Sequence, residues 1–169
     1  MDRMFVETKI DAGDGGEIEG LGWVFAQPDR VGDVIQKGAF ADAKVPLPML
    51  FGHDPNDPVG AWEVVEEADD GLRLKGRLLV AEVPRAREVQ ALVKAGAVRG
   101  LSVGFRTQKA DRRGRGRTIT KLELLEVSLV TMPCHPGAQV ASAKSAVRAL
   151  HLSALLNRAS ARLSEGTDR

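Results

Sequence analysis

Residues 99–105 read Arg-Gly-Leu-Ser-Val-Gly-Phe and place one hydroxyl, that of Ser102, between two glycines. In a β-strand, successive side chains point to opposite faces. One face would carry the apolar residues that enter the core, which are Leu101, Val103 and Phe105. The other would carry Gly100, Ser102 and Gly104, so that a peptide backbone could approach the hydroxyl without obstruction. A solvent-facing serine between glycines that permit a bulge is the alternative, and the pattern alone slightly favours it.

A serine hydroxyl becomes a nucleophile only with a base beside it. The histidines of the chain are His53, His135 and His151. His53 is the best placed, because it ends an apolar stretch at the onset of a loop and Gly52 leaves room beside it. A loop histidine that bonds Asp54 or Asp57 fits the pattern equally well.

Glu126 is the candidate for an acid that orients the base. Glu123 and Glu126 are an odd number of residues apart, so a regular strand turns them to opposite faces. One can be solvated while the other shares a face with apolar neighbours. A buried carboxylate is costly unless it is paired, and an imidazolium would be a suitable partner. Pairing of Glu126 with Arg99 or Arg106 stays open.

Cys134 and His135 offer a competing chemistry in a loop bounded by Pro133 and Pro136. A zinc site would need further Cys or His ligands at suitable spacing, and neither residue has them. A Cys134 nucleophile would need His135 as its base, but adjacent residues of an extended segment point to opposite faces. The cysteine is therefore the weaker candidate.

Ser102, His53 and Glu126 together supply a nucleophile, a base and an orienting carboxylate on separate strands or strand ends. This is the composition of a Ser-His-acid site, which needs no metal or organic cofactor.

The elements that must position these residues are mostly short strands. They are predicted at 4–10, 17–26, 34–35, 49–51, 59–67, 71–80, 98–107 and 117–131. Pro46 and Pro48 favour an edge position for the strand at 49–51. One helix is marked by Pro84 at its start and Gly96 at its end, and a leucine stripe predicts another within 138–164. This order indicates an α+β, mainly β fold, a barrel or sandwich with helices outside, and excludes a doubly wound nucleotide-binding sheet.

Bulk composition narrows the class of protein. The chain has 169 residues, with 24 basic against 23 acidic side chains and a formal net charge of +1, which gives no support to nucleic-acid binding. One cysteine excludes an internal disulfide, and no apolar run approaches the roughly 20 residues of a membrane span. No secretory signal is visible, so a soluble intracellular protein is expected. The basic run at 112–117 is interpreted as a solvated hairpin tip, with contact to an acidic partner as the alternative.

Several blocks in a fixed order carry a family resemblance over residues 19–138. They lie at 32–35, 38–40, 50–54, 96–105 and 125–131. With them the chain resembles the prohead maturation proteases of tailed phages, whose fold is similar to that of herpesvirus assemblin. The resemblance implies an assemblin-like antiparallel β-barrel over residues 1–137 with a few external helices, followed by a helical tail at 138–169.

By this resemblance Ser102 is the nucleophile, His53 the general base and Glu126 the third member. It further implies oxyanion donors in the backbone at Cys134 and His135, although relatives usually carry small or polar residues there. The substrate would pass over the two glycines that flank the serine, Gly100 and Gly104.

The implied function is that of a serine endopeptidase that cleaves the scaffolding segment of the major capsid protein, and itself, during procapsid maturation. Its place would be the assembling procapsid of a phage, prophage or gene-transfer particle in the cytoplasm of a bacterial host. The alternative is an inactive head-assembly protein of the same fold that binds capsid or scaffold. The apolar tail is expected to pack on the barrel or to join copies into a homo-oligomer such as a dimer, with a cleavable targeting segment as the alternative.

Overall fold

The computed structural model describes residues 15–140. Over this range the elements are β1 (Glu17–Val24), β2 (Val34–Ile35), β3 (Leu47–Phe51), β4 (Pro58–Glu67), β5 (Gly71–Leu78), α1 (Pro84–Lys94), β6 (Gly100–Arg113), β7 (Gly116–Val130) and β8 (Gln139–Val140). The strand expected at 4–10 lies outside the described residues. So does most of the helix expected at 138–164, and Gln139–Val140 form a strand where helix was predicted.

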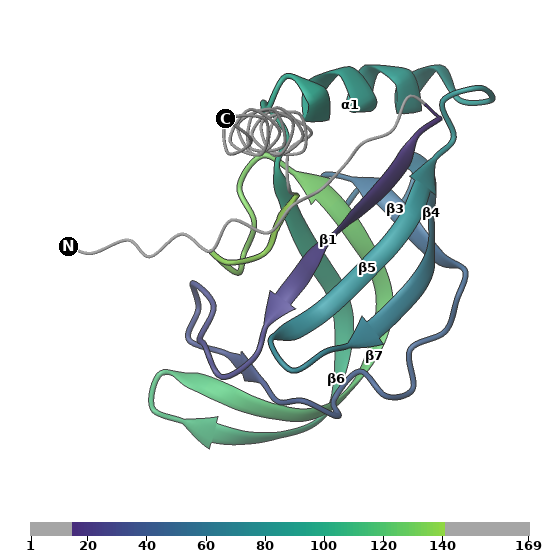
Figure 1. The fold of residues 1–169 in the computed structure, drawn as a ribbon. Helices are drawn as coiled ribbons and strands as arrows, with labels where there is room; N and C mark the ends of the chain where they lie inside the picture. The colour runs from purple at the N-terminus through teal and green to yellow at the C-terminus, as the bar shows by residue number, and fades with distance from the viewer. Residues whose placement is uncertain (1–14, 141–169) are drawn as a thin grey trace, which may run out of the picture.

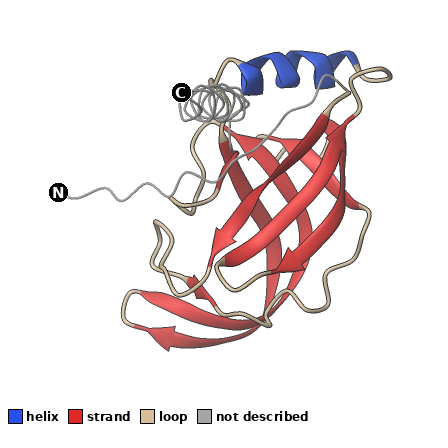
Figure 2. Ribbon diagram, viewed as in Figure 1, coloured by secondary structure: helices blue, strands red, loops and turns tan. Residues whose placement is uncertain are grey.

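The strands form one curled sheet whose pairing returns to its starting point (Figure 1). The order runs β7-β3-β4-β5-β1-β8-β6, and β6 pairs again with β7. Most pairs are antiparallel, while β2 and β3 run parallel to β7. Figure 2 shows α1 lying across one end of the barrel. The predicted mainly β barrel is confirmed.

The helix α1 begins and ends where its sequence predicts. Pro84 occupies the first turn, where a missing N–H costs nothing, and Gly96 adopts a φ of 75° just beyond the end. The helix buries Ala86, Val89 and Val93 against the barrel. No helix within residues 15–140 has the length and apolar character needed to cross a membrane.

The prediction that the strand after Pro46 and Pro48 lies at an edge is wrong. β3 pairs with β4 on one side and with β7 on the other. Its ladder with β7 begins at Met49, so Pro48, which has no N–H to donate, lies before that ladder. β3 can therefore run through the interior of the sheet, and its C-terminal end delivers His53 next to β7.

The longest strands, β6 and β7, form a hairpin whose tip extends beyond the barrel (Figure 1). The tip turns at Gly114, with a φ of 57°, and this confirms the predicted hairpin. Arg117 is not a free solvated charge, however, because its guanidinium pairs with Asp33. The body of the same hairpin carries Ser102 and Glu126.

Candidate active site

Ser102 lies on β6 directly opposite Ser128 of β7. Its neighbour Leu101 is fully buried in the core, as the alternation predicts. Ser102 itself is only 5% exposed, so its hydroxyl is not the freely solvated group that the alternative interpretation required. The hydroxyl lies on the face of β6 away from the core, together with the side chain of Glu126.

The prediction that Glu123 and Glu126 face opposite sides is wrong. Gly104 pairs with Glu126 and Phe105 with Leu124, so Leu125 has no partner of its own in the ladder. This bulge inserts one residue into β7 and shifts the alternation. Both glutamates therefore point away from the core, and Glu123 pairs with Arg106 at 3.0 Å. That pair removes Arg106 as a partner for Glu126.

Gly104 makes room for the Glu126 carboxylate. A Cβ atom built at Gly104 would overlap Glu126 Oε1, and the next nearest atoms also belong to the Glu126 side chain. The other flanking glycine, Gly100, makes room in the same way, because a Cβ there would lie 2.6 Å from Pro133 Cδ. Both glycines thus accommodate side chains of this chain, beside the serine that they flank.

His53 follows β3 in a left-handed backbone conformation, with a φ of 62°. This conformation costs a non-glycine residue about 1–2 kcal/mol. Its ring Nδ1 lies 2.7 Å from Glu126 Oε1, while Asp54 and Asp57 bond other residues. A carboxylate only accepts hydrogen bonds, so Nδ1 carries the hydrogen and Nε2 remains the basic nitrogen of the neutral ring.

Ser128, which the sequence reasoning did not single out, connects the histidine to the glutamate. It is fully buried, and its Oγ donates to Glu126 Oε2 at 2.7 Å. The same oxygen accepts from the backbone N–H of His53 at 3.0 Å. Its spacing of two residues from Glu126 was the available signal, because i and i+2 share a face of a strand.

Within the described residues, the acid Glu126 contacts the base His53. Ser102 is close to both along the β6–β7 ladder, because Ser102 pairs with Ser128 and Glu126 pairs with Gly104. No hydrogen bond joins Ser102 Oγ to His53 in this structure, and His53 Nε2 has no partner within residues 15–140. Catalytic hydrogen bonds of this kind are often long before substrate binds and shorten in the complex.

The turn at residues 133–136 lies against the same region. The residues that line a cavity of about 40 Å³ include Ser102, Cys134, His135, Trp23 and Asp29. Trp23 Nε1 is the one buried side-chain nitrogen or oxygen in the described part of the chain that lacks a hydrogen-bond partner.

Cys134 and His135 do not form a nucleophile and its base. Partial desolvation of the sulfur, followed by the nearby Asp29 carboxylate, raises the pKa of the Cys134 thiol although the residue is exposed, so the thiol stays protonated and donates to Asp29 at 3.4 Å. Burial lowers the pKa of His135, which keeps its ring neutral. Both its nitrogens are engaged, Nδ1 by Gly137 N at 3.1 Å and Nε2 by Gln27 O at 3.3 Å.

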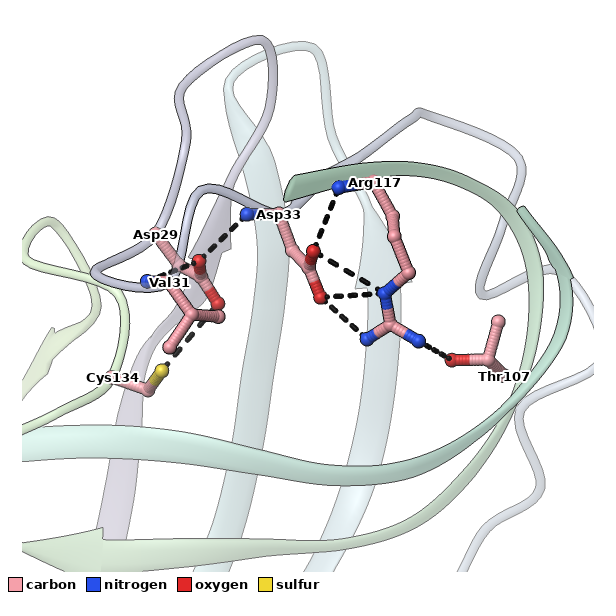
Figure 3. A network of polar contacts seen from close by, with 6 residues as sticks. All are labelled: Asp29, Val31, Asp33, Thr107, Arg117 and Cys134. Carbon is pink, nitrogen blue, oxygen red and sulfur yellow. Dashed lines mark hydrogen bonds and ion pairs between the residues drawn. The ribbon is translucent and has the colours of Figure 1, made fainter. Parts of the chain in front are cut away.

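A polar network fixes the loop at residues 27–33 against this turn (Figure 3). Asp29 accepts from the backbone of Val31 and Asp33 and from the Cys134 thiol. Asp33 in turn binds the Arg117 side chain, with Arg117 Nε 3.1 Å from Asp33 Oδ2. The guanidinium also holds the pKa of the Asp33 carboxyl below its usual value. The loop, the turn and the hairpin are thereby tied together.

Comparison with solved structures supports the fold. The chain is similar to the KSHV protease, solved in complex with a hexapeptide phosphonate inhibitor, with a TM-score of 0.52 and 17% identity over 75% of this chain and 64% of that one. It is equally similar to the bacteriophage T4 capsid assembly protease, with a TM-score of 0.52 and 17% identity over 68% of this chain and 81% of that one.

Comparison with known sequences gives higher identities than the comparison with solved structures. The chain is 36% identical to the prohead protease of Enterobacteria phage HK97 over 83% of this chain and 67% of that protein. It is 32% identical to the prohead protease of Escherichia phage T5, over 69% of this chain and 58% of that protein. It also matches 19% of the capsid polyprotein of Pseudomonas phage PAJU2, at 33% identity over 70% of this chain.

The family model described as caudovirus prohead serine protease matches residues 5–152, which is most of the chain. The first two of these relatives are prohead proteases, and the third is a capsid polyprotein of which this chain spans only a small part. The chain therefore belongs to the caudovirus prohead serine protease family.

Proposed function

We propose that this protein is a serine endopeptidase in which Ser102 is the nucleophile, His53 the general base and Glu126 the orienting acid. The observation that carries the proposal is the 2.7 Å contact between His53 Nδ1 and Glu126 Oε1 on the face that also bears Ser102. That contact fixes the tautomer in which Nε2 can accept a proton, as the chemistry requires.

The reaction would proceed by acyl transfer. Ser102 Oγ attacks the scissile carbonyl carbon while its proton passes to His53 Nε2. The C–N bond then breaks, and the proton moves from His53 to the leaving amine. A water molecule attacks the acyl-enzyme in the same way, with His53 as base, and releases the acid and the free hydroxyl of Ser102. Glu126 keeps the ring oriented and stabilises its charged form throughout.

The turn at 133–136 is proposed to hold the oxyanion. Pro133 and Pro136 have no N–H, so Cys134 and His135 hold the only two backbone donors of this turn. Neither N–H donates to another described residue, and both residues line the cavity beside Ser102. Two such unpaired donors near the nucleophile are what a developing oxyanion needs.

The substrate is proposed to be the major capsid protein, at the boundary of its scaffolding segment, and secondarily the protease itself. The names of the relatives support this choice, since two are prohead proteases and one is a capsid polyprotein. The cavity of about 40 Å³ beside Ser102 suits a small substrate side chain.

Ser102→Ala tests the proposal. Cleavage of the capsid precursor is expected to fall by about 10⁴-fold or more, because the acyl-enzyme cannot form. The matched control is Thr120→Ala, which removes another hydroxyl of the same hairpin, one that donates to Lys109 O at 3.5 Å. Products are identified by mass spectrometry, and a peptide phosphonate should modify Ser102 alone. Full activity of Ser102→Ala would exclude the mechanism.

A second candidate function is an inactive head-assembly protein of the same fold. The observation in its favour is that Ser102 and His53 are not hydrogen-bonded to each other. It predicts binding of the capsid precursor without cleavage and no reaction of Ser102 with a phosphonate. The same two assays therefore separate the candidates.

A further inference from the structure

We propose that Ser128 is a positioning residue that holds the base and the acid of the site in register with each other. This inference rests on the proposed function, because it concerns how His53 and Glu126 are kept in their working geometry. Ser128 lies within a buried strand, and its role follows from its contacts with His53 and Glu126.

The direction of each hydrogen bond at Ser128 Oγ follows from what its partners can donate or accept. A hydroxyl has one hydrogen to donate and lone pairs to accept. A carboxylate cannot donate, so the Ser128 hydrogen goes to Glu126 Oε2, at 2.7 Å. The backbone N–H of His53 can only donate, so it uses a lone pair of the same oxygen, at 3.0 Å. One atom thus joins the main chain of the base to the carboxylate of the acid.

The Glu126 carboxylate is divided between two partners. Oε1 contacts His53 Nδ1 and Oε2 accepts from Ser128, which leaves the side chain 13% exposed. Without the Ser128 hydroxyl, Oε2 would have no protein donor that the structure describes, and the carboxylate could rotate. Rotation would withdraw Oε1 from the imidazole, whose orientation depends on it.

The backbone of His53 depends on the same hydroxyl. The ladder between β3 and β7 ends at Phe51, and one more bond, Gly52 N to Leu129 O at 3.0 Å, continues it. Gly52 and His53 both adopt a left-handed conformation, and at His53 the Ser128 side chain replaces a main-chain carbonyl as the acceptor. The His53 ring is 44% exposed, so packing alone does not hold it.

Ser102 stands opposite this hydroxyl. Ser102 and Ser128 are a directly facing pair of the β6–β7 ladder, where Cβ atoms lie about 5 Å apart. Ser128 thus holds His53 and Glu126 at the position along the β6–β7 ladder that Ser102 occupies. A rigid strand is a more accurate platform for this purpose than the loop that carries His53.

The test is Ser128→Ala, compared with Ser128→Thr and with Thr120→Ala. Loss of a hydrogen bond to a charged group predicts a fall of about 10–100-fold in kcat for Ser128→Ala, with KM nearly unchanged. Ser128→Thr keeps the hydroxyl and is expected to recover most of that loss. Thr120→Ala, on the same strand, should behave as the unmodified protein.

A purely structural role is separated by repeating Ser128→Ala in a His53→Ala background. If Ser128 acts through the histidine, it has no further effect on the residual activity there, whereas a structural loss would appear again in full. The low-field NMR signal of the His53 Nδ1 proton should also broaden or vanish in Ser128→Ala.

The outcomes distinguish the two proposals. An active Ser102→Ala variant contradicts the proposed function itself. Inactive Ser102→Ala and His53→Ala variants alongside a fully active Ser128→Ala overturn only the role of Ser128. Equal losses for Ser128→Ala in both backgrounds also overturn it, in favour of a structural role.

Discussion

At the scale of single residues, the site depends on the side chain that Gly104 lacks as well as on the side chains that carry the chemistry. The Glu126 carboxylate lies over Gly104 because that residue has no Cβ to exclude it. Glu126 and Ser128 share a face of β7, and Ser128 is the partner of Ser102, so regular alternation already turns Glu126 to the face of Ser102; the bulge at Leu125 changes the facing of Glu123. The missing side chain of Gly104 and the regular pairing around Ser102 together place the acid.

Gly104→Ala is expected to destabilise the protein by about 1–3 kcal/mol, because the new methyl group would occupy the space of Glu126 Oε1. The measurement is urea unfolding. The matched control is the same substitution in a Glu126→Ala background, where the obstructing atoms are gone and the cost should nearly vanish. Equal costs in both backgrounds would mean that Gly104 is needed for another reason.

At the scale of elements, the loop at residues 27–33 connects the hairpin to the turn beside Ser102. Arg30 donates from its backbone N–H to Cys134 O and from Nε to Pro133 O, both at 3.2 Å. At the other end of the loop, Asp33 binds Arg117 of β7 (Figure 3). The position of the proposed oxyanion donors therefore depends on an ion pair in a different part of the chain.

Asp33 and Arg117, the two residues of this ion pair, should differ in their contribution to the free energy of unfolding. The Asp33 side chain is 7% exposed and that of Arg117 is 49% exposed. Arg117→Met leaves Asp33 Oδ2 without a donor, while Oδ1 keeps the backbone N–H of residue 117, and the expected cost is about 1–3 kcal/mol. Asp33→Asn leaves a guanidinium that can turn to water, so it should cost less. Arg115→Met at the hairpin tip is the control, expected within about 0.5 kcal/mol of the unmodified protein in urea unfolding. The reverse order would show that Arg117 contributes packing rather than charge.

Sequence periodicity predicts the elements well and their irregularities poorly. Alternation and turn residues locate the strands and α1, because each depends on local chemistry. The bulge at Leu125 has no local signature, so the facing of Glu123 was predicted wrongly. Pro48 is compatible with an interior strand only because the parallel ladder begins one residue later, which is a tertiary fact. Ser128 was missed because its one sequence signal, the spacing of two residues from Glu126, gains meaning only when the contact between Glu126 and His53 is known.

At the scale of the whole molecule, the barrel closes at the same place as the candidate site. Strand β8 pairs with β1 at Gly20 and Leu21 and with β6 only at Gly100. Beside this short closure, the rings of Trp23 and His135 pack with centroids 4.6 Å apart. His135 is 2% exposed, so the closure includes a buried titratable ring.

This ring makes the stability of the fold depend on pH. Burial lowers the pKa of His135 from its ordinary value of 6.5. As the pH falls below 6.5, His135 binds a proton in the unfolded chain, whereas in the folded protein it binds one only near its own lower pKa. The contribution of His135 is therefore complete above pH 6.5 and declines below it, by at most about 1.4 kcal/mol per pH unit.

Urea unfolding at pH 7.5, 6.5 and 5.5 measures this dependence. The unmodified protein is expected to lose stability between pH 6.5 and 5.5. His135→Phe keeps an aromatic ring against Trp23 but cannot titrate, so it should be less stable at every pH and show a flatter dependence. Trp23→Phe is the matched control, because it alters the same ring contact and leaves His135 in place. It should retain the slope of the unmodified protein. If His135→Phe retains that slope as well, the acid sensitivity arises from groups other than the histidine at the closure.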